Sequence, residues 1–181
     1  KQIKIELLSD LVEALILRDA SDIFKVKRVD AFRKLLALLA MQAGSMVNLS
    51  EIASHCSVSV GTVSSHIEIL EESHVVRAIR PYAGGKRREL TGTTKVFFVD
   101  NGVRNTLMND FSENITLRAD GGQLFENWTF TEILKAAPLL GTIRFWRSKA
   151  GAEVDFIIEY GGKTSGIEVK FKNLAKPGLS R

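Results

Sequence analysis

Residues 151–170 read GAEVDFIIEYGGKTSGIEVK, and this stretch predicts a β-hairpin. Two runs rich in β-branched and aromatic residues flank the pair Gly161 and Gly162, and glycine pairs favour two-residue hairpin loops. Such a loop places Tyr160 directly opposite Lys163. The register of the whole hairpin then follows by counting outward from that pair.

The register brings charged residues to one face of the hairpin. Asp155 comes opposite Glu168, and Glu153 comes opposite Lys170, with Cβ atoms of opposed residues about 4.5–5.5 Å apart. Two opposed carboxylates repel, and a hard divalent cation such as Mg²⁺ or Mn²⁺ would compensate them. Lys170 shares the face of Glu168, because the two residues are two positions apart. A Lewis acid, an activated water and a fixed positive charge are what metal-assisted phosphodiester hydrolysis requires.

A second interpretation of the same residues needs no metal. Charged residues are common on the solvent side of a hairpin, and Glu153 with Lys170 would form an ordinary cross-strand ion pair worth at most about 1 kcal/mol. An acidic residue followed at variable distance by Glu-x-Lys is also a short and permissive pattern. Spacing alone therefore leaves both interpretations open.

The first part of the chain predicts helices. Apolar spacing indicates one over residues 5–19 and another over residues 30–44, which Asp30 would cap. A helix-turn-helix unit follows over residues 48–76. Its first helix has Asn48 and Glu51 at capping-box spacing, and Ser59 can cap the second.

A hairpin wing is expected after the helix-turn-helix unit, with strands over residues 75–82 and 95–100. The basic residues between these strands are Lys86, Arg87 and Arg88. They would lie along a nucleic-acid backbone, or they form a solvated tip. The preceding helix, residues 60–72, has no Arg, Lys, Asn or Gln for reading bases, which favours packing or protein interaction over DNA reading by that helix.

The last part of the chain predicts one helix followed by three strands. The helix spans residues 123–137, is apolar nearly all round, and is expected to stop at Pro138. Strands are expected over residues 142–147, 153–160 and 163–171. A polar, turn-rich stretch before the helix is the expected domain boundary.

Composition restricts the class of protein. The 181 residues are 45% hydrophobic and 25% charged, which is typical of a soluble globular protein. Cys56 is the single cysteine, so an intrachain disulfide or a multi-cysteine zinc site is excluded and a cytoplasmic location is expected. No apolar run is long enough for a membrane span. The chain begins at Lys1 without a methionine, and we interpret it as a fragment of a longer protein.

Several motifs together resemble a known family. The stretches "LFENWTFTEIL", "FWRSKAGAEVDFII" and "GIEVK", preceded by "LILRDASDIF" and "KVFFVDNGV", resemble the uncharacterised C-terminal region of prokaryotic AAA-type P-loop ATPases. That region is similar to the PD-(D/E)XK nuclease superfamily. The resemblance implies an α+β chain, with a helical winged helix-turn-helix domain over residues 1–110. A restriction-endonuclease-like α/β domain, truncated at its C-terminus, would follow over residues 111–181.

The resemblance also implies roles for individual residues. Asp155 and Glu168 would bind the metal, Mg²⁺ or Mn²⁺, and Lys170 would be the catalytic lysine. Glu126, in the preceding helix, would be a further metal ligand, or else a glutamate on the helix surface. Glu153 is left as a partner of Lys170.

The implied function is that of the C-terminal part of an AAA-type ATPase with a nuclease-like domain that binds a divalent metal and acts on nucleic acid. The sequence contains no G-x-x-x-x-G-K-[ST] motif, so ATP would bind only in the full-length parent. Expected partners are nucleic acid at the wing and the nuclease-like face, the missing ATPase module and a second copy of the protein, with no membrane. The alternatives are a non-catalytic protein- or DNA-interaction module that keeps the nuclease fold, and a DNA-binding regulator.

Overall fold

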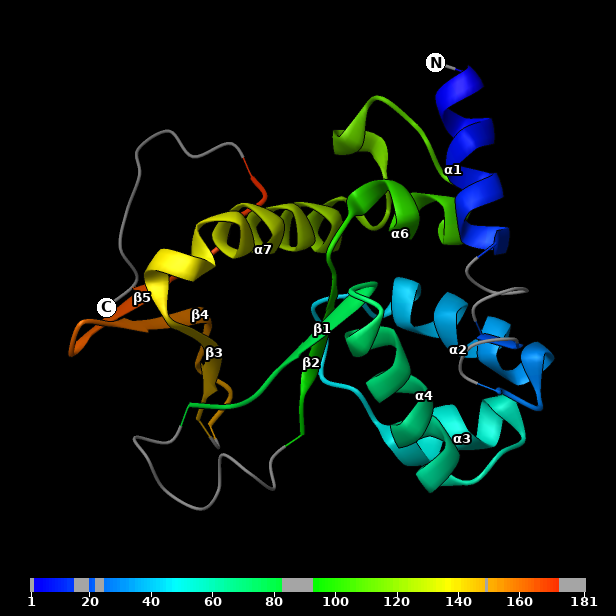
Figure 1. The fold of residues 1–181 in the computed structure, drawn as a ribbon. Coiled ribbons are helices and arrows are strands. Elements are labelled where there is room, and N and C mark those ends of the chain that lie inside the picture. The colour runs from blue at the N-terminus through cyan, green and yellow to red at the C-terminus, as the bar shows by residue number, and fades with distance from the viewer. Residues whose placement is uncertain (1, 15–19, 22–24, 83–92, 149, 173–181) are drawn as a thin grey trace.

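The computed structural model describes residues 2–14, 20–21, 25–82, 93–148 and 150–172, with the backbone alone at residues 137–140. The N-terminal half runs from α1 to α6 and the C-terminal half from α7 onward, and the two lie side by side (Figure 1). The N-terminal elements are α1 (Gln2–Ala14), α2 (Val29–Met41), α3 (Leu49–Cys56), α4 (Val60–Glu72), β1 (Val76–Ile79), β2 (Lys95–Phe98) and α6 (Asn101–Met108). The later elements are η2 (Ile115–Leu117), α7 (Gly121–Leu140), β3 (Thr142–Arg147), β4 (Glu153–Tyr160) and β5 (Lys163–Ile167).

The two helices and the turn expected over residues 48–76 are present. The side chain of Asn48 accepts hydrogen bonds from the backbone N–H groups of Ser50 and Glu51, both at 3.2 Å, and so caps α3. The turn after α3 places Ser57 in the left-handed region at φ 53°. The hydroxyl of Ser59 then accepts a hydrogen bond from the N–H of Thr62 at 3.0 Å and caps α4. Local capping chemistry therefore fixes both helix starts.

The cap expected for α2 is wrong, and the helix ends at Met41 rather than at residue 44. Arg28, not Asp30, occupies the N-cap position, and no side chain caps this helix. Asp30 lies in the first turn, where its carboxylate forms an ion pair with Arg28 at 2.6 Å. An acidic side chain in the first turn also interacts favourably with the helix dipole. Of the helix expected over residues 5–19, α1 covers Gln2–Ala14, and residues 15–19 lie outside the described part of the chain.

The expected hairpin strands are present in the N-terminal half. β1 pairs antiparallel with β2, from Val76 opposite Phe98 to Ile79 opposite Lys95. The residues before α3 add to this sheet, because Gly44 N–H bonds to the carbonyl of Val96 at 2.9 Å. The stretch between the strands, residues 83–92 with the expected wing residues, lies outside the described residues.

The C-terminal half is a helix followed by three antiparallel strands in the order β3-β4-β5. The expected stop at Pro138 is wrong, because α7 continues to Leu140. Pro138 has no backbone N–H and so removes one helical hydrogen bond, but the helical backbone continues for two residues beyond it. β5 ends at Ile167 rather than at residue 171, because the N–H of Val169 bonds to the carboxylate of Asp155 at 2.7 Å and leaves the strand ladder.

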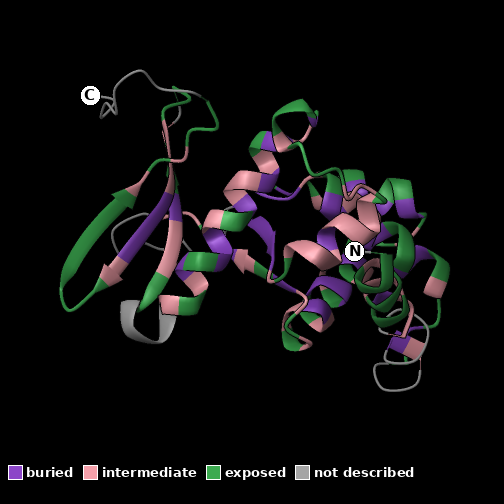
Figure 2. Ribbon diagram, turned by 90° about the horizontal axis from the view of Figure 1, so that it is seen from above, coloured by how far each residue is buried: buried purple, intermediate pink, exposed green. Residues whose placement is uncertain are grey.

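The helix α7 is not enclosed on all sides, although its sequence is apolar nearly all round. Phe130 is fully buried, whereas Trp128 is 48% exposed. Figure 2 shows buried and exposed positions alternating around the helices, with an exposed edge at β5. Within the described ranges, neither α7 nor another helix is long and apolar enough to cross a membrane.

A single aromatic core joins the two halves. Phe97 of β2 stacks on Phe130 of α7 with ring centroids 4.7 Å apart, and its ring lies 5.3 Å from that of Phe156 in β4. Ile79 and Phe145 belong to the same buried cluster. The backbone continues this contact, because the chain beyond β1 runs beside β3 through a parallel bridge at Phe145. The C-terminal sheet therefore packs directly on the hairpin of the N-terminal half.

A buried amide connects α7 to β2. Asn127 is fully buried. Its Oδ1 accepts the N–H of Phe98 at 2.8 Å, and its Nδ2 donates to the carbonyl of Phe98 at 3.0 Å and to Asn101 Oδ1 at 2.9 Å. Buried polar groups are costly without partners, and here the side-chain amide satisfies both backbone groups of one residue. The contact places Glu126, the preceding residue, against the N-terminal half.

The ion-pair network of Asp120 gives a stability prediction. Asp120 accepts hydrogen bonds from Arg104 at 2.7 Å and from Arg118 at 2.8 Å, and the Arg104 side chain is fully buried. Removing one partner of a buried pair leaves an uncompensated charge, so we expect Asp120→Asn to lower the free energy of unfolding at pH 7 by about 3 kcal/mol. Asp30→Asn, at an exposed ion pair with Arg28, should cost much less than Asp120→Asn.

The loss of unfolding free energy in Asp120→Asn should depend on pH in a defined direction. The hydrogen bonds from Arg118 hold the pKa of Asp120 well below its usual range. The stabilisation by Asp120 is therefore present above the ordinary aspartate pKa of about 3.9 and is lost as the pH falls through the lower folded value. Urea unfolding between pH 7 and pH 2 should show the free energies of unfolding of wild type and Asp120→Asn converging as the pH falls. A constant difference, or none at pH 7, would contradict the assignment.

Candidate functional site

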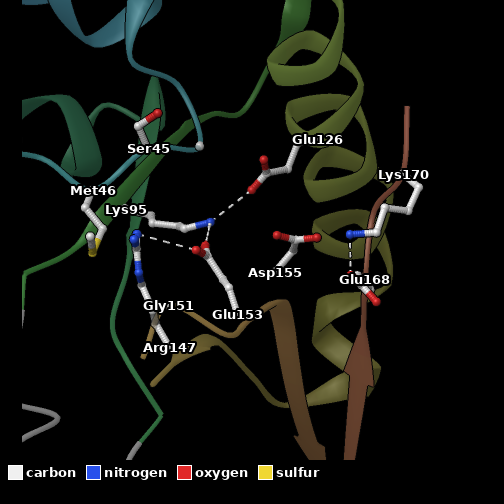
Figure 3. A pocket seen from close by; sticks show the side chains of 11 residues that line it. Ser45, Met46, Lys95, Glu126, Arg147, Gly151, Glu153, Asp155, Glu168 and Lys170 are labelled. Atoms are coloured by element: carbon white, nitrogen blue, oxygen red, sulfur yellow. Dashed lines mark hydrogen bonds and ion pairs between the residues drawn. The ribbon is translucent and has the colours of Figure 1, made fainter. Parts of the chain in front are cut away.

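A polar cavity of about 530 Å³ lies where the two halves meet (Figure 3). Its charged lining residues are Glu126, Glu153, Asp155 and Glu168, with Lys95, Arg147 and Lys170. This one cavity is lined by all the residues predicted for the catalytic and metal site, namely Glu126, Asp155, Glu168 and Lys170. The carboxylates outnumber the cations by one, four against three.

The secondary structure explains how these side chains meet. Glu153 and Asp155 are two positions apart on β4 and so share a face of the sheet. Glu126 comes from α7, which packs across this sheet. The N-terminal half contributes Lys95, the first residue of β2, and the turn at Gly44 that pairs with β2. The cavity therefore has walls from both halves.

Lys95 is the central cation of the cavity. Its side chain is only 4% exposed, and its Nζ lies 2.6 Å from Glu153 Oε1 and 3.1 Å from Glu126 Oε1. Burial by itself would lower the pKa of Lys95, but the charges of Glu126 and Glu153 outweigh burial and raise the pKa. The ammonium group is therefore charged at neutral pH, and it bridges two carboxylates from two different elements.

Sequence analysis did not single out Lys95 as a site residue. The signal available in the sequence is its place at the head of the apolar run KVFF. All four residues of β2 are buried in the structure, the lysine included.

Glu126 points into the cavity and is not a glutamate on the helix surface. Its side chain is 19% exposed. Burial raises the pKa of Glu126, and the nearby charges of Asp155 and Glu153 raise it further, while Lys95 opposes this effect. Three acidic side chains are thus close enough to affect one another, and Lys95 neutralises them only in part.

The register expected for the hairpin is confirmed for the five pairs nearest the loop. Tyr160 pairs with Lys163, and the ladder continues outward to Phe156 opposite Ile167. It stops one step before Asp155 and Glu168. There the carboxylate of Asp155 accepts the backbone N–H of Val169, which holds the Glu-x-Lys segment against β4.

The expected ion pair between Glu153 and Lys170 is wrong. Glu153 binds Lys95 and lies 3.5 Å from Arg147, whereas Lys170 forms its ion pair with Glu168. The strand ends before the position where Glu153 and Lys170 would be opposed, so the two side chains turn to different partners. The hydrogen bond from Lys170 to Glu168 raises the pKa of Lys170.

The fit of the expected metal ligands differs from residue to residue. Among the residues that the structure describes, no group of three or more histidine, cysteine, aspartate or glutamate side chains is arranged to hold a metal ion. Glu126 is bound to Lys95 and does not join Asp155 and Glu168 in such a group. Asp155 and Glu168 still line the same cavity and offer the hard oxygen donors that Mg²⁺ and Mn²⁺ prefer. Asp155 points into the space between the Lys95 group and the Lys170–Glu168 pair (Figure 3).

Comparison with known protein families shows which family the chain belongs to. Residues 1–114 match the family described as "Domain of unknown function (DUF8612)", and the chain belongs to this family. Residues 121–180 match a second family, "Domain of unknown function (DUF4143)", a domain typically found in AAA-ATPase-associated proteins. The cavity is lined by residues from both matched segments.

The similar curated proteins are longer than this chain. An uncharacterised protein of Mycobacterium tuberculosis is 24% identical over 151 residues, which is 82% of this chain and 33% of that protein. An uncharacterised protein of Haemophilus influenzae is 23% identical over 175 residues, covering 94% of this chain and 41% of that protein. The chain thus spans between a third and two fifths of the length of these relatives. No solved structure matches it.

Replacing Lys95 tests the energetic importance of this charge. Without the ammonium group, Glu126 and Glu153 would be left without their shared partner, so Lys95→Met should lower the free energy of unfolding at pH 7 by about 3 kcal/mol. The deficit should shrink as the pH falls, because Glu126, with its raised pKa, takes up a proton first. Urea unfolding measures both effects.

Lys135→Met is the matched control, because Lys135 is exposed and pairs with Glu132 within α7. It should cost less than about 0.5 kcal/mol. Equal losses in the two variants would show that Lys95 is an ordinary surface lysine.

Proposed function

We propose that this chain is the C-terminal part of an AAA-type ATPase, in which a winged helix is joined to a PD-(D/E)XK nuclease-like domain that acts on nucleic acid. The observation that carries the proposal is that Asp155, Glu168 and Lys170 line a single polar cavity at the open end of the β4–β5 hairpin. The C-terminal family match, typical of AAA-ATPase-associated proteins, and the greater length of the relatives support it.

The residues of the cavity suit phosphodiester chemistry. Asp155 and Glu168 would hold Mg²⁺ or Mn²⁺, and such an ion supplies Lewis acidity when it is bound. The side chain of Lys170 is 49% exposed, and its ammonium would contact a phosphate oxygen of the substrate. The hydrogen bond from Val169 N–H to Asp155 fixes the orientation of that carboxylate. Arg147, 43% exposed at the rim, offers a second cation to a nucleic-acid backbone.

The N-terminal half supports the winged-helix part of the proposal. Three helices, α2 to α4, precede the β1–β2 hairpin, and the turn at Gly44 adds to that hairpin. α4 has no Arg, Lys, Asn or Gln to place in a DNA groove, and its one histidine, His66, is buried. Contact with nucleic acid would therefore come from the wing at Lys86, Arg87 and Arg88. ATP would bind in the ATPase module of the full-length protein.

A second candidate function is a non-catalytic interaction module with the same fold. The observation that favours it is the charge balance of the cavity. Lys95 already bridges Glu126 and Glu153, and Lys170 is paired with Glu168. Three of the four carboxylates are thus already paired with cations, and such a site can be stable without a metal.

A nuclease assay on the full-length protein separates the two candidates. With Mg²⁺ or Mn²⁺, Asp155→Asn and Lys170→Ala should each reduce cleavage of DNA or RNA by about 100-fold or more. The matched control is Lys163→Ala, at an exposed lysine beside the hairpin loop, and it should cleave like wild type. Equal activity in all four proteins, or none in wild type, would favour the interaction module.

Binding at the wing is measured separately. Replacing Lys86, Arg87 and Arg88 with alanine removes up to three phosphate contacts, so the slope of log K against log salt for duplex DNA should become shallower by about 2–3. Fluorescence anisotropy in EDTA measures this without cleavage. The matched control variant removes the same charge at Lys4, Lys34 and Lys135. Identical slopes for the two triple variants would exclude wing binding.

A further inference from the structure

The cation at the centre of this cavity comes from the opposite half of the protein. Lys95 begins β2 in the N-terminal half, yet its Nζ lies 2.6 Å from Glu153 and 3.1 Å from Glu126, which both belong to the C-terminal half. The lysine is 3% exposed. Its ammonium also lies over the ring of Phe145, 5.5 Å from the centroid.

Three carboxylates crowded into one cavity require a nearby positive charge. Glu126, Glu153 and Asp155 line the same space, and like charges there repel. In a nuclease-like site, a divalent metal ion would commonly supply that charge. Here the ammonium of Lys95 lies between Glu126 and Glu153, where it meets one oxygen of each. The lysine thus does for this pair what a bound cation would do.

The surrounding structure holds Lys95 in that place. A backbone bridge joins Lys95 to Met46, and the neighbouring N–H of Val47 bonds to the carbonyl of Thr94 at 2.9 Å. Gly44 packs against Glu126, because a Cβ at that position would lie 3.2 Å from the carboxyl carbon. A larger residue with the same φ of +79° would be strained and would press on the glutamate. The N-terminal half therefore forms one wall of the cavity and supplies its counter-charge.

We propose that Lys95 is the resident cation of this cavity and competes with divalent ions for Glu126 and Glu153. A divalent ion is thereby confined to the side of Asp155 and Glu168, and Glu126 is a partner of Lys95 and not a metal ligand. The inference deepens the proposed function, because it names the residue that controls metal occupancy at that site. It also makes the site dependent on the N-terminal half.

Manganese binding to the nucleotide-free, full-length protein tests the inference. The signal of free Mn²⁺ in electron paramagnetic resonance gives the affinity, and the melting temperature in EDTA and in Mn²⁺ gives an independent readout. Lys95→Met should bind Mn²⁺ at least tenfold more tightly than wild type and gain more thermal stability from it. Lys95→Arg, which keeps the charge, and Lys135→Met, which removes an exposed one, should behave like wild type.

A double variant identifies the carboxylates involved. Adding Glu153→Gln to Lys95→Met should abolish the gain in Mn²⁺ affinity, because one of the two released ligands is gone. If Lys95→Met binds Mn²⁺ no more tightly than wild type, the inference is overturned. If that variant does not fold, Lys95→Gln, whose amide can still donate to one carboxylate, is judged by the same criterion.

The proposed function fails on different results. It requires wild-type Mn²⁺ binding that Asp155→Asn removes. If wild type does not bind Mn²⁺, the proposed function fails. The role of Lys95 is then still decided by whether Lys95→Met binds Mn²⁺ more tightly than wild type.

Discussion

A lysine charge buried between two carboxylates links the two halves of this protein. Lys95 brings its ammonium from β2 to Glu126 on α7 and Glu153 on β4, and the same ammonium lies over the ring of Phe145, 5.5 Å from its centroid. A buried pair of this kind is weak evidence of net stabilisation, but removing one member is costly. The arrangement therefore specifies how the halves dock, since a shifted docking would bury these charges unpaired.

The same contacts explain why the cavity lies where it does. Asn127 fixes α7 to β2 through both backbone groups of Phe98, and the next residue along the helix toward the N-terminus is Glu126. β4 faces this helix with Glu153 and Asp155, and Asp155 in turn holds the Glu-x-Lys segment through Val169. The polar site is a consequence of how the two family segments pack, and neither segment contains all of it.

Local chemistry is what the sequence predicts well in this chain. The glycine pair after Tyr160 sets the hairpin register, and the caps at Asn48 and Ser59 start their helices, because each depends on residues a few positions apart. The membership of Asp155, Glu168 and Lys170 in one cavity follows from that register and from the family resemblance.

The role of Lys95 could not be predicted, because its partner Glu126 lies 31 residues away and only tertiary packing brings them together. The early end of β5 depends on the Asp155 side chain accepting the backbone N–H of Val169, which periodicity does not reveal.

One side of this cavity already holds its cation in the form of Lys95. Crystals of the full-length protein soaked in Mn²⁺ and measured at the manganese absorption edge test it directly. The account predicts an anomalous peak between Asp155 and Glu168 with Lys95 still bridging Glu126 and Glu153, and a peak bound by Glu126 with Lys95 displaced would contradict it.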